Sequence, residues 1–130
     1  MPFDFTVSDV IPATPQKIYD AWLDSKGHAN LTGGAPAKVS AKEGAKFTAW
    51  DGYITGTNIK LEPGKRIVQA WRTTEFKKSD PDSQIELLLE PVKGGTKVTL
   101  NHTNVPDGQT GYQSGWQENY FDTMKEFFSK

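Results

Sequence analysis

The chain ends on its most aromatic segment, SGWQENYFDTMKEFFSK, which covers residues 114–130. Read as a helix at about 100° per residue, the run from Tyr112 onward gathers its large apolar side chains within an arc of roughly 180°. These side chains are Tyr112, Trp116, Tyr120, Phe121, Met124, Phe127 and Phe128. A helix with such a wide apolar face requires a second layer of structure to cover it, and this requirement limits the folds open to the chain.

The second layer is predicted to be an antiparallel sheet. FDFTVSDVI alternates apolar and polar residues from Phe3, as a half-buried strand does. Further strand-like segments, separated by turn signals, are EGAKFTAW, DGYITGTNIKLE, PGKRIVQAW, SQIELLLEPV and GGTKVTLNHTNV. Among the turn signals, Asp51-Gly52 predicts a two-residue hairpin turn, because such a turn needs positive φ. Since the closing helix is the element long enough to cover one face of this sheet, the predicted class is α+β.

Shorter helical signals lie outside the sheet segments. Thr14 before Pro15 has the pattern of an N-cap followed by the first helical residue, so we expect a helix of about ten residues there. The next segment, SKGHANLTGG, is interrupted by glycine and fits either a short helical turn or a loop. Thr110 and Gln113 have capping-box spacing, which predicts the start of the closing helix.

Length and composition exclude several classes. A chain of 130 residues is expected to form one domain, residues 1–130. With 15 Lys+Arg against 16 Asp+Glu, it lacks the basic excess of a nucleic-acid-binding protein. The sequence holds no cysteine, so disulfides and thiolate chemistry are excluded. No apolar stretch has the length of a membrane span or the pattern of a leader, so we expect a cytoplasmic protein with no membrane partner.

Two polar residues fall among apolar ones and indicate a binding cavity. Gln117 projects into the apolar arc of the closing helix, where an unpaired amide would cost on the order of 1–3 kcal/mol. It is therefore expected to bond either to a strand or to a ligand in a cleft. His102 alternates in phase with Val98 and Leu100, so it either is a hydrogen-bonded core residue or faces that cleft. Candidate cavity-lining residues are Gln117, Trp116, Tyr120, Met124, His102, Trp71 and Trp22.

The sequence assigns no catalytic residue, cofactor or metal. Patterns such as GxSxG, a phosphate-binding loop or a legible Ser-His-Asp order are absent. His28 lies between glycines without a second ligand at metal-binding spacing. We therefore expect a binding protein, and an enzyme is the least favoured interpretation.

The chain resembles a known family. DGYITGTNIKLEPGKRIVQAWR is similar to the DGxxxGxxxxLxPxKxIVxxWR stretch of the C-terminal domain in activators of the 90-kDa heat-shock protein ATPase. VPDGQTGYQSGWQENYFDTMKEFF resembles the closing segment of that family, with its GWQxxYF core, and IPATPQKIYDAWLD extends the likeness over almost the whole chain. This family falls within the SRPBCC, or START-like, superfamily. The resemblance implies a helix-grip fold: a curved antiparallel sheet around a long C-terminal helix, with two short helices after the first strand.

The resemblance also implies a chaperone partner of the 90-kDa heat-shock protein family. Because the first predicted strand begins at Phe3, the N-terminal domain of two-domain activators is expected to be missing, and the chain is expected to act as a stand-alone, non-catalytic binding module. The alternative is a module that binds a small apolar ligand between helix and sheet. A third and least favoured interpretation is a cyclase or hydrolase that uses His102 with a carboxylate in the cleft.

Overall fold

A computed structural model describes residues 2–129 and contains one antiparallel sheet in the order β1-β6-β5-β4-β3-β2. From β2 to β6, each strand pairs with the strand that follows it in the chain. The first strand, β1, is an edge strand and pairs with β6. The strands are β1 (Phe3–Ile11), β2 (Lys46–Ala49), β3 (Ile54–Glu62), β4 (Arg66–Thr73), β5 (Ser83–Val92) and β6 (Gly95–Val105). The predicted α+β class with an antiparallel sheet is confirmed.

Two short helices follow β1, as the resemblance implied. Helix α1 (Pro15–Trp22) begins after Thr14, whose hydroxyl accepts a hydrogen bond from the Lys17 amide at 3.3 Å. Helix α2 (Ser25–Leu31) settles the open question about SKGHANLTGG, because Asp24 caps it by accepting from the Gly27 amide at 2.8 Å. A Cβ on Gly27 would lie 2.8 Å from the Ala21 backbone, so glycine lets the two helices approach closely.

The C-terminal helix is long but not uniform. It runs through α3 (Tyr112–Trp116), a π-helical turn η1 (Gln117–Phe121) and α4 (Asp122–Phe128). At the π turn, the Asp122 amide donates to the Gln117 carbonyl, five residues back. The predicted capping box is wrong: the N-cap residue is Gly111, and no side chain caps the helix there.

The hairpin between β2 and β3 differs from the predicted two-residue turn. Ala49 pairs with Ile54, so the loop contains four residues, and Trp50, Asp51 and Gly52 have φ values of 52°, 55° and 90°. Positive φ is strained for a bulky residue such as tryptophan. The Asp51 amide anchors this loop by donating to the Pro36 carbonyl at 2.9 Å.

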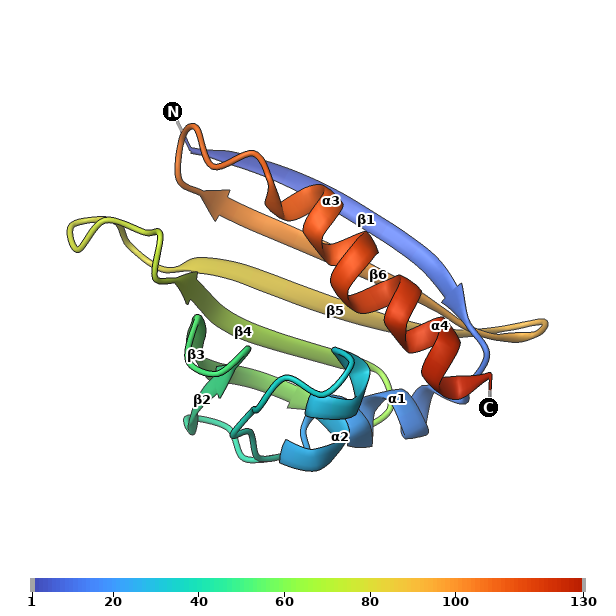
Figure 1. Cartoon of the computed structure of the whole chain (residues 1–130). Helices are drawn as coiled ribbons and strands as arrows, with labels where there is room; N and C mark the ends of the chain where they lie inside the picture. The colour runs from blue at the N-terminus through green and yellow to red at the C-terminus, as the bar shows by residue number, and fades with distance from the viewer. Residues whose placement is uncertain (1, 130) are drawn as a thin grey trace.

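The C-terminal helix lies across the inner face of the curved sheet, on the side of β1 and β6 (Figure 1). Helices α1 and α2 lie on the side of β3 and β4, and α2 contacts α4. Side chains from both layers form one core in which Ile18, Leu87, Leu100, Phe121 and Met124 are fully buried. Within residues 2–129, no helix is long and apolar enough to cross a membrane.

Candidate functional site

A cavity of about 510 Å³ opens between the first turns of the C-terminal helix and the sheet. Strands β3 and β4 line it on one side, and residues 108–111 lie at the helix start on the other. Its walls are largely aromatic, made by Trp50, Tyr53, Trp71, Tyr112, Trp116 and Tyr120. The volume falls in the range of small-molecule sites, about 300–1,000 Å³.

The candidate residues divide between the cavity wall and the core behind it. Trp71, Trp116 and Tyr120 line the cavity. Trp22 is buried behind them, with its ring 6.2 Å from Trp116 and 5.1 Å from Tyr120. Met124 and His102 are fully buried and belong to the core. Trp50 also lines the cavity, but it lies in the β2-β3 loop at positive φ, where strand alternation does not predict the direction of a side chain.

Gln117 does not face the cavity, which corrects its place among the lining residues. Its side chain is half-buried and donates to Asp9 on β1 and to Asp122, both at 2.9 Å. Lys125 contacts the same Asp9 carboxylate at 2.8 Å. The π turn brings residues five apart onto one face, so Gln117 pairs with Asp122 on the β1 flank instead of following the 100° arc. The expected hydrogen bond from Gln117 to a strand is present, and its acceptor is the Asp9 side chain of β1.

His102 is held beneath Trp116 by a directed chain of hydrogen bonds. The Trp116 indole N–H donates to His102 Nδ1 at 3.0 Å, so the ring proton sits on Nε2. Nε2 then donates to the Ser83 hydroxyl at 2.8 Å, and that hydroxyl donates to the Trp71 carbonyl at 2.6 Å. Burial lowers the pKa of His102 to about 3. The imidazole is therefore neutral, with both nitrogens engaged, and it joins the helix to three strands.

His28 forms a second buried anchor for the helix. Its Nδ1 donates to the Trp22 carbonyl at 2.9 Å, and its Nε2 accepts from the Tyr120 hydroxyl at 2.8 Å. Burial lowers the pKa of His28 to about 4. Within residues 2–129, no cluster of three or more metal-binding side chains is present.

The cavity mouth contains a closed ring of hydrogen bonds that the sequence did not reveal. Thr73 donates to the Tyr112 hydroxyl, which donates to Gln109, both at 2.7 Å. The Gln109 amide donates to the Glu75 carbonyl at 3.0 Å, and the Glu75 amide returns to the Thr73 hydroxyl at 3.1 Å. Tyr53 donates its hydroxyl to the Glu75 carboxylate. The ring joins the end of β4 to the loop before α3 and fixes Glu75 at the mouth.

A second buried polar chain holds the segment before β2 against the sheet. The Trp22 indole donates to Gln69 at 3.2 Å, and Gln69 donates to Asn58 at 2.9 Å. Asn58 in turn donates to the carbonyls of Ser40 and Lys42 at 2.8 and 3.0 Å. The signal for this chain is present in KRIVQAW, where Gln69 is in phase with the buried Ile67 and Trp71.

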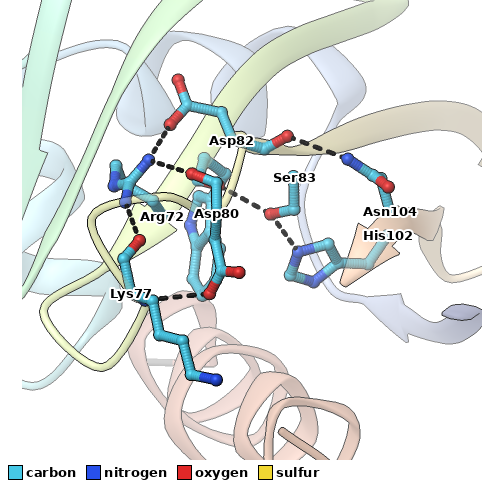
Figure 2. A network of polar contacts seen from close by, with 8 residues as sticks. Arg72, Lys77, Asp80, Asp82, Ser83, His102 and Asn104 are labelled. Carbon is cyan, nitrogen blue, oxygen red and sulfur yellow. Dashed lines mark hydrogen bonds and ion pairs between the residues drawn. The ribbon is translucent and has the colours of Figure 1, made fainter. Parts of the chain in front are cut away.

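The loop between β4 and β5 is organised by Arg72, as Figure 2 shows. The guanidinium donates to the carbonyls of Asp80 and Lys77 at 3.1 and 3.0 Å and to the Asp82 carboxylate at 2.8 Å. It also lies 5.4 Å from the centre of the Phe76 ring. Asn104 of β6 ties the far end of the loop by donating to the Asp82 carbonyl at 3.3 Å. The loop is thus ordered from within, although most of it is exposed.

Comparison with curated proteins finds relatives named as chaperone ATPase activators. The "Activator of 90 kDa heat shock protein ATPase homolog" of Dictyostelium discoideum is 36% identical over 118 residues, which are 89% of this chain and 30% of that protein. The homolog 1 of Homo sapiens is 28% identical over 127 residues, 95% of this chain and 36% of that protein. The chain thus spans about a third of the length of the curated relatives it matches.

Solved structures share the fold. An HSP90 activator from Plasmodium falciparum superposes with a TM-score of 0.87 at 24% identity, over 98% of this chain and 96% of that one. An AHSA1-like protein from Aeromonas hydrophila superposes with a TM-score of 0.73 at 19% identity, over 97% and 92%. At these identities the likeness shows the helix-grip fold alone.

A family model described as "Activator of Hsp90 ATPase homolog 1-like protein" matches residues 12–129. This span includes α1 and its cap, five strands of the sheet and the C-terminal helix that closes the cavity. The chain therefore belongs to the family of activator of Hsp90 ATPase homolog 1-like proteins.

Proposed function

We propose that the chain is a non-catalytic module that binds a 90-kDa heat-shock chaperone. The observation that carries the proposal is the 36% identity, over 89% of the chain, to a relative named as an activator of that chaperone's ATPase. Because the chain corresponds to about a third of its curated relatives, the proposal concerns binding and does not include stimulation of the ATPase. We also propose a cytoplasmic location, because a chain without cysteine needs no oxidising compartment in which to form disulfides.

The loop between β4 and β5 is the surface that we assign to this partner. It presents Lys77 and Lys78 to solvent, and Arg72 orders its backbone before any partner binds. A preordered loop loses less conformational entropy on binding than a flexible one. The loop also lies at the end of the sheet opposite the β5-β6 hairpin, which offers a distant control (Figure 1).

The test is an NMR titration of labelled protein with the 90-kDa chaperone of the same source. We expect line broadening centred on residues 74–82, and weaker binding when Lys77 and Lys78 are changed to glutamate. The control is Lys93→Glu on the β5-β6 hairpin, which should leave binding unchanged. A spectrum that is unaffected at tens of micromolar chaperone would contradict the proposal, and broadening elsewhere would relocate the surface.

A second role is favoured by the cavity itself, which we propose as a site for a small molecule with an apolar body. The roughly 510 Å³ of space beside Trp71, Trp116 and Tyr120 supports it. Gly115 lines the same space, and a Cβ built there meets only the Asn119 amide, at 3.8 Å. Gly115→Leu should therefore fill the cavity and abolish ligand binding, whereas Gly115→Ala should leave most of it open. Binding of an aromatic fragment that survives Gly115→Leu would contradict this second role.

A further inference from the structure

The described lining of the cavity includes an acidic side chain and no basic one. Among its described lining residues, Glu75 is the one acidic side chain, and no lysine, arginine or histidine lines the space. Arg72, which precedes the loop that carries Glu75, is committed to the loop backbone and to Asp82 (Figure 2). A ligand in the cavity therefore meets a negative charge without a positive one.

The carboxylate is also positioned. Both backbone polar groups of Glu75 belong to the hydrogen-bonded ring: its amide donates to Thr73, and its carbonyl accepts from Gln109. The hydroxyl of Tyr53 holds the carboxylate itself. Glu75 therefore stays at the mouth of the cavity instead of sampling solvent freely.

The tyrosines of the cavity offer their rings and not their hydroxyl protons. Tyr53 donates to Glu75, Tyr112 donates to Gln109, and Tyr120 donates to His28. A bound anion would thus gain no hydrogen bond from these hydroxyls. Aromatic faces beside a carboxylate instead suit a cation, which is attracted by ring quadrupoles and by the opposite charge.

We propose that the cavity binds a small organic cation, a protonated or quaternary amine with an apolar body, whose charged end contacts Glu75 at the mouth. This inference rests on the second role above, ligand binding in the cavity. The apolar body lies against Trp71 and Trp116, deeper in the space. Carboxylate, phosphate and sulfate ligands are disfavoured because the described lining lacks a positive charge.

The test uses three soluble probes that differ mainly in charge: 2-phenylethylamine, which is protonated at pH 7, neutral 2-phenylethanol and anionic phenylacetate. Affinities are measured by following the tryptophan indole resonances in NMR titrations. We expect the ammonium probe to bind roughly tenfold more tightly than the alcohol, and the carboxylate to bind most weakly. Glu75→Gln should reduce the preference for the ammonium probe to within about twofold while leaving the alcohol unaffected. The control is Glu90→Gln, an exposed carboxylate on β5, which should retain the full preference.

The outcomes separate the two levels of the proposal. If the alcohol or the carboxylate binds at least as tightly as the ammonium probe, the cation assignment is overturned and ligand binding in the cavity stands. If Glu75→Gln keeps the full preference for the cation, Glu75 does not carry it and the assignment fails. If none of the probes shifts a cavity tryptophan at millimolar concentration, ligand binding in the cavity and the cation assignment fall together.

Discussion

The two ends of the helix-sheet interface contrast in packing. At the α4 end, Phe121 and Met124 are fully buried, and α2 and β1 pack against the helix. At the α3 end, Trp116 is buried but Tyr112 is half-buried, and the aromatic side chains surround a cavity. The π turn Gln117–Phe121 separates the two ends.

The contrast shows how a single apolar face can serve two purposes. Two buried, neutral histidines tie walls of the cavity to the rest of the fold: Tyr120 bonds to His28, and Trp116 bonds to His102. These directed bonds hold the aromatic walls apart where close packing is missing. The packed end therefore accounts for stability, and the open end supplies the binding space of the proposed second role.

The largest difference between the ends is expected from truncating an aromatic ring at the packed one. Phe121→Ala removes a fully buried ring and should lower the free energy of unfolding by about 3–5 kcal/mol. The matched change at the open end, Tyr112→Ala, truncates a half-buried ring beside the cavity and should cost less, about 1–3 kcal/mol. Urea denaturation measures both. Equal losses would mean that the two ends are packed alike.

Acid should weaken both histidine anchors together. The unfolded histidines take up protons below a pKa of about 6.5, whereas burial keeps the pKa of His28 at about 4 and that of His102 at about 3. The unfolded state then binds more protons, so stability is present above pH 6.5 and is lost as the pH falls through 5. We expect a loss of about 1 kcal/mol per pH unit for each histidine.

Urea denaturation between pH 7 and pH 5 tests this, with NMR of the two imidazole rings as the control. Most carboxylates remain ionised over that range, so the histidines dominate the change. Stability that is constant from pH 7 to pH 5, or an imidazole that titrates near pH 6.5 in the folded protein, would show that an anchor is solvated.

Two helical glycines, Gly27 and Gly115, differ in the room that each leaves for an added methyl group. Gly27→Ala places a Cβ 2.8 Å from the Ala21 backbone, so it should destabilise the fold by about 1–3 kcal/mol. Gly115→Ala meets only the Asn119 amide at 3.8 Å, so it should stabilise by about 0.5–1 kcal/mol through helix propensity. Thermal unfolding distinguishes the opposite signs. A destabilising Gly115→Ala would mean that the cavity end cannot accept added volume.

The smallest effect is expected at the π turn. Gln117→Leu removes half-buried hydrogen bonds to Asp9 and Asp122 on the β1 flank, and should change stability by less than about 1 kcal/mol. Because the side chain lies outside the cavity, probe affinity should not change. If affinity falls severalfold in this variant while the fold is retained, Gln117 acts on the cavity after all.

Much of the fold was predictable because its signals are local. Alternation and turn residues located the strands, and the Thr14-Pro15 pair located the start of α1, since each signal acts within a few residues. Gln117 was misplaced because a π turn leaves no mark in the apolar pattern and shifts the helix phase. The turn at Asp51 proved longer than predicted, because Trp50 also adopts positive φ.

The cavity mouth was not predictable for a different reason. Thr73 and Glu75 are separated in sequence from Gln109 and Tyr112, and sheet curvature decides whether they meet. No local pattern encodes such a ring. By contrast, the inward placement of His102 followed from its phase with Val98 and Leu100, and so did the hydrogen-bonded core interpretation.

The open end of the helix-sheet interface should admit a small molecule, and the packed end should not. NMR spectra of the indole N–H groups and the Met124 methyl group, recorded while neutral 2-phenylethanol is added, test it without relying on charge. We expect shifts at Trp50 and Trp116 while the Met124 methyl resonance stays in place. Shifts at Met124 with silent Trp50 and Trp116, or no shift at tens of millimolar, would contradict it.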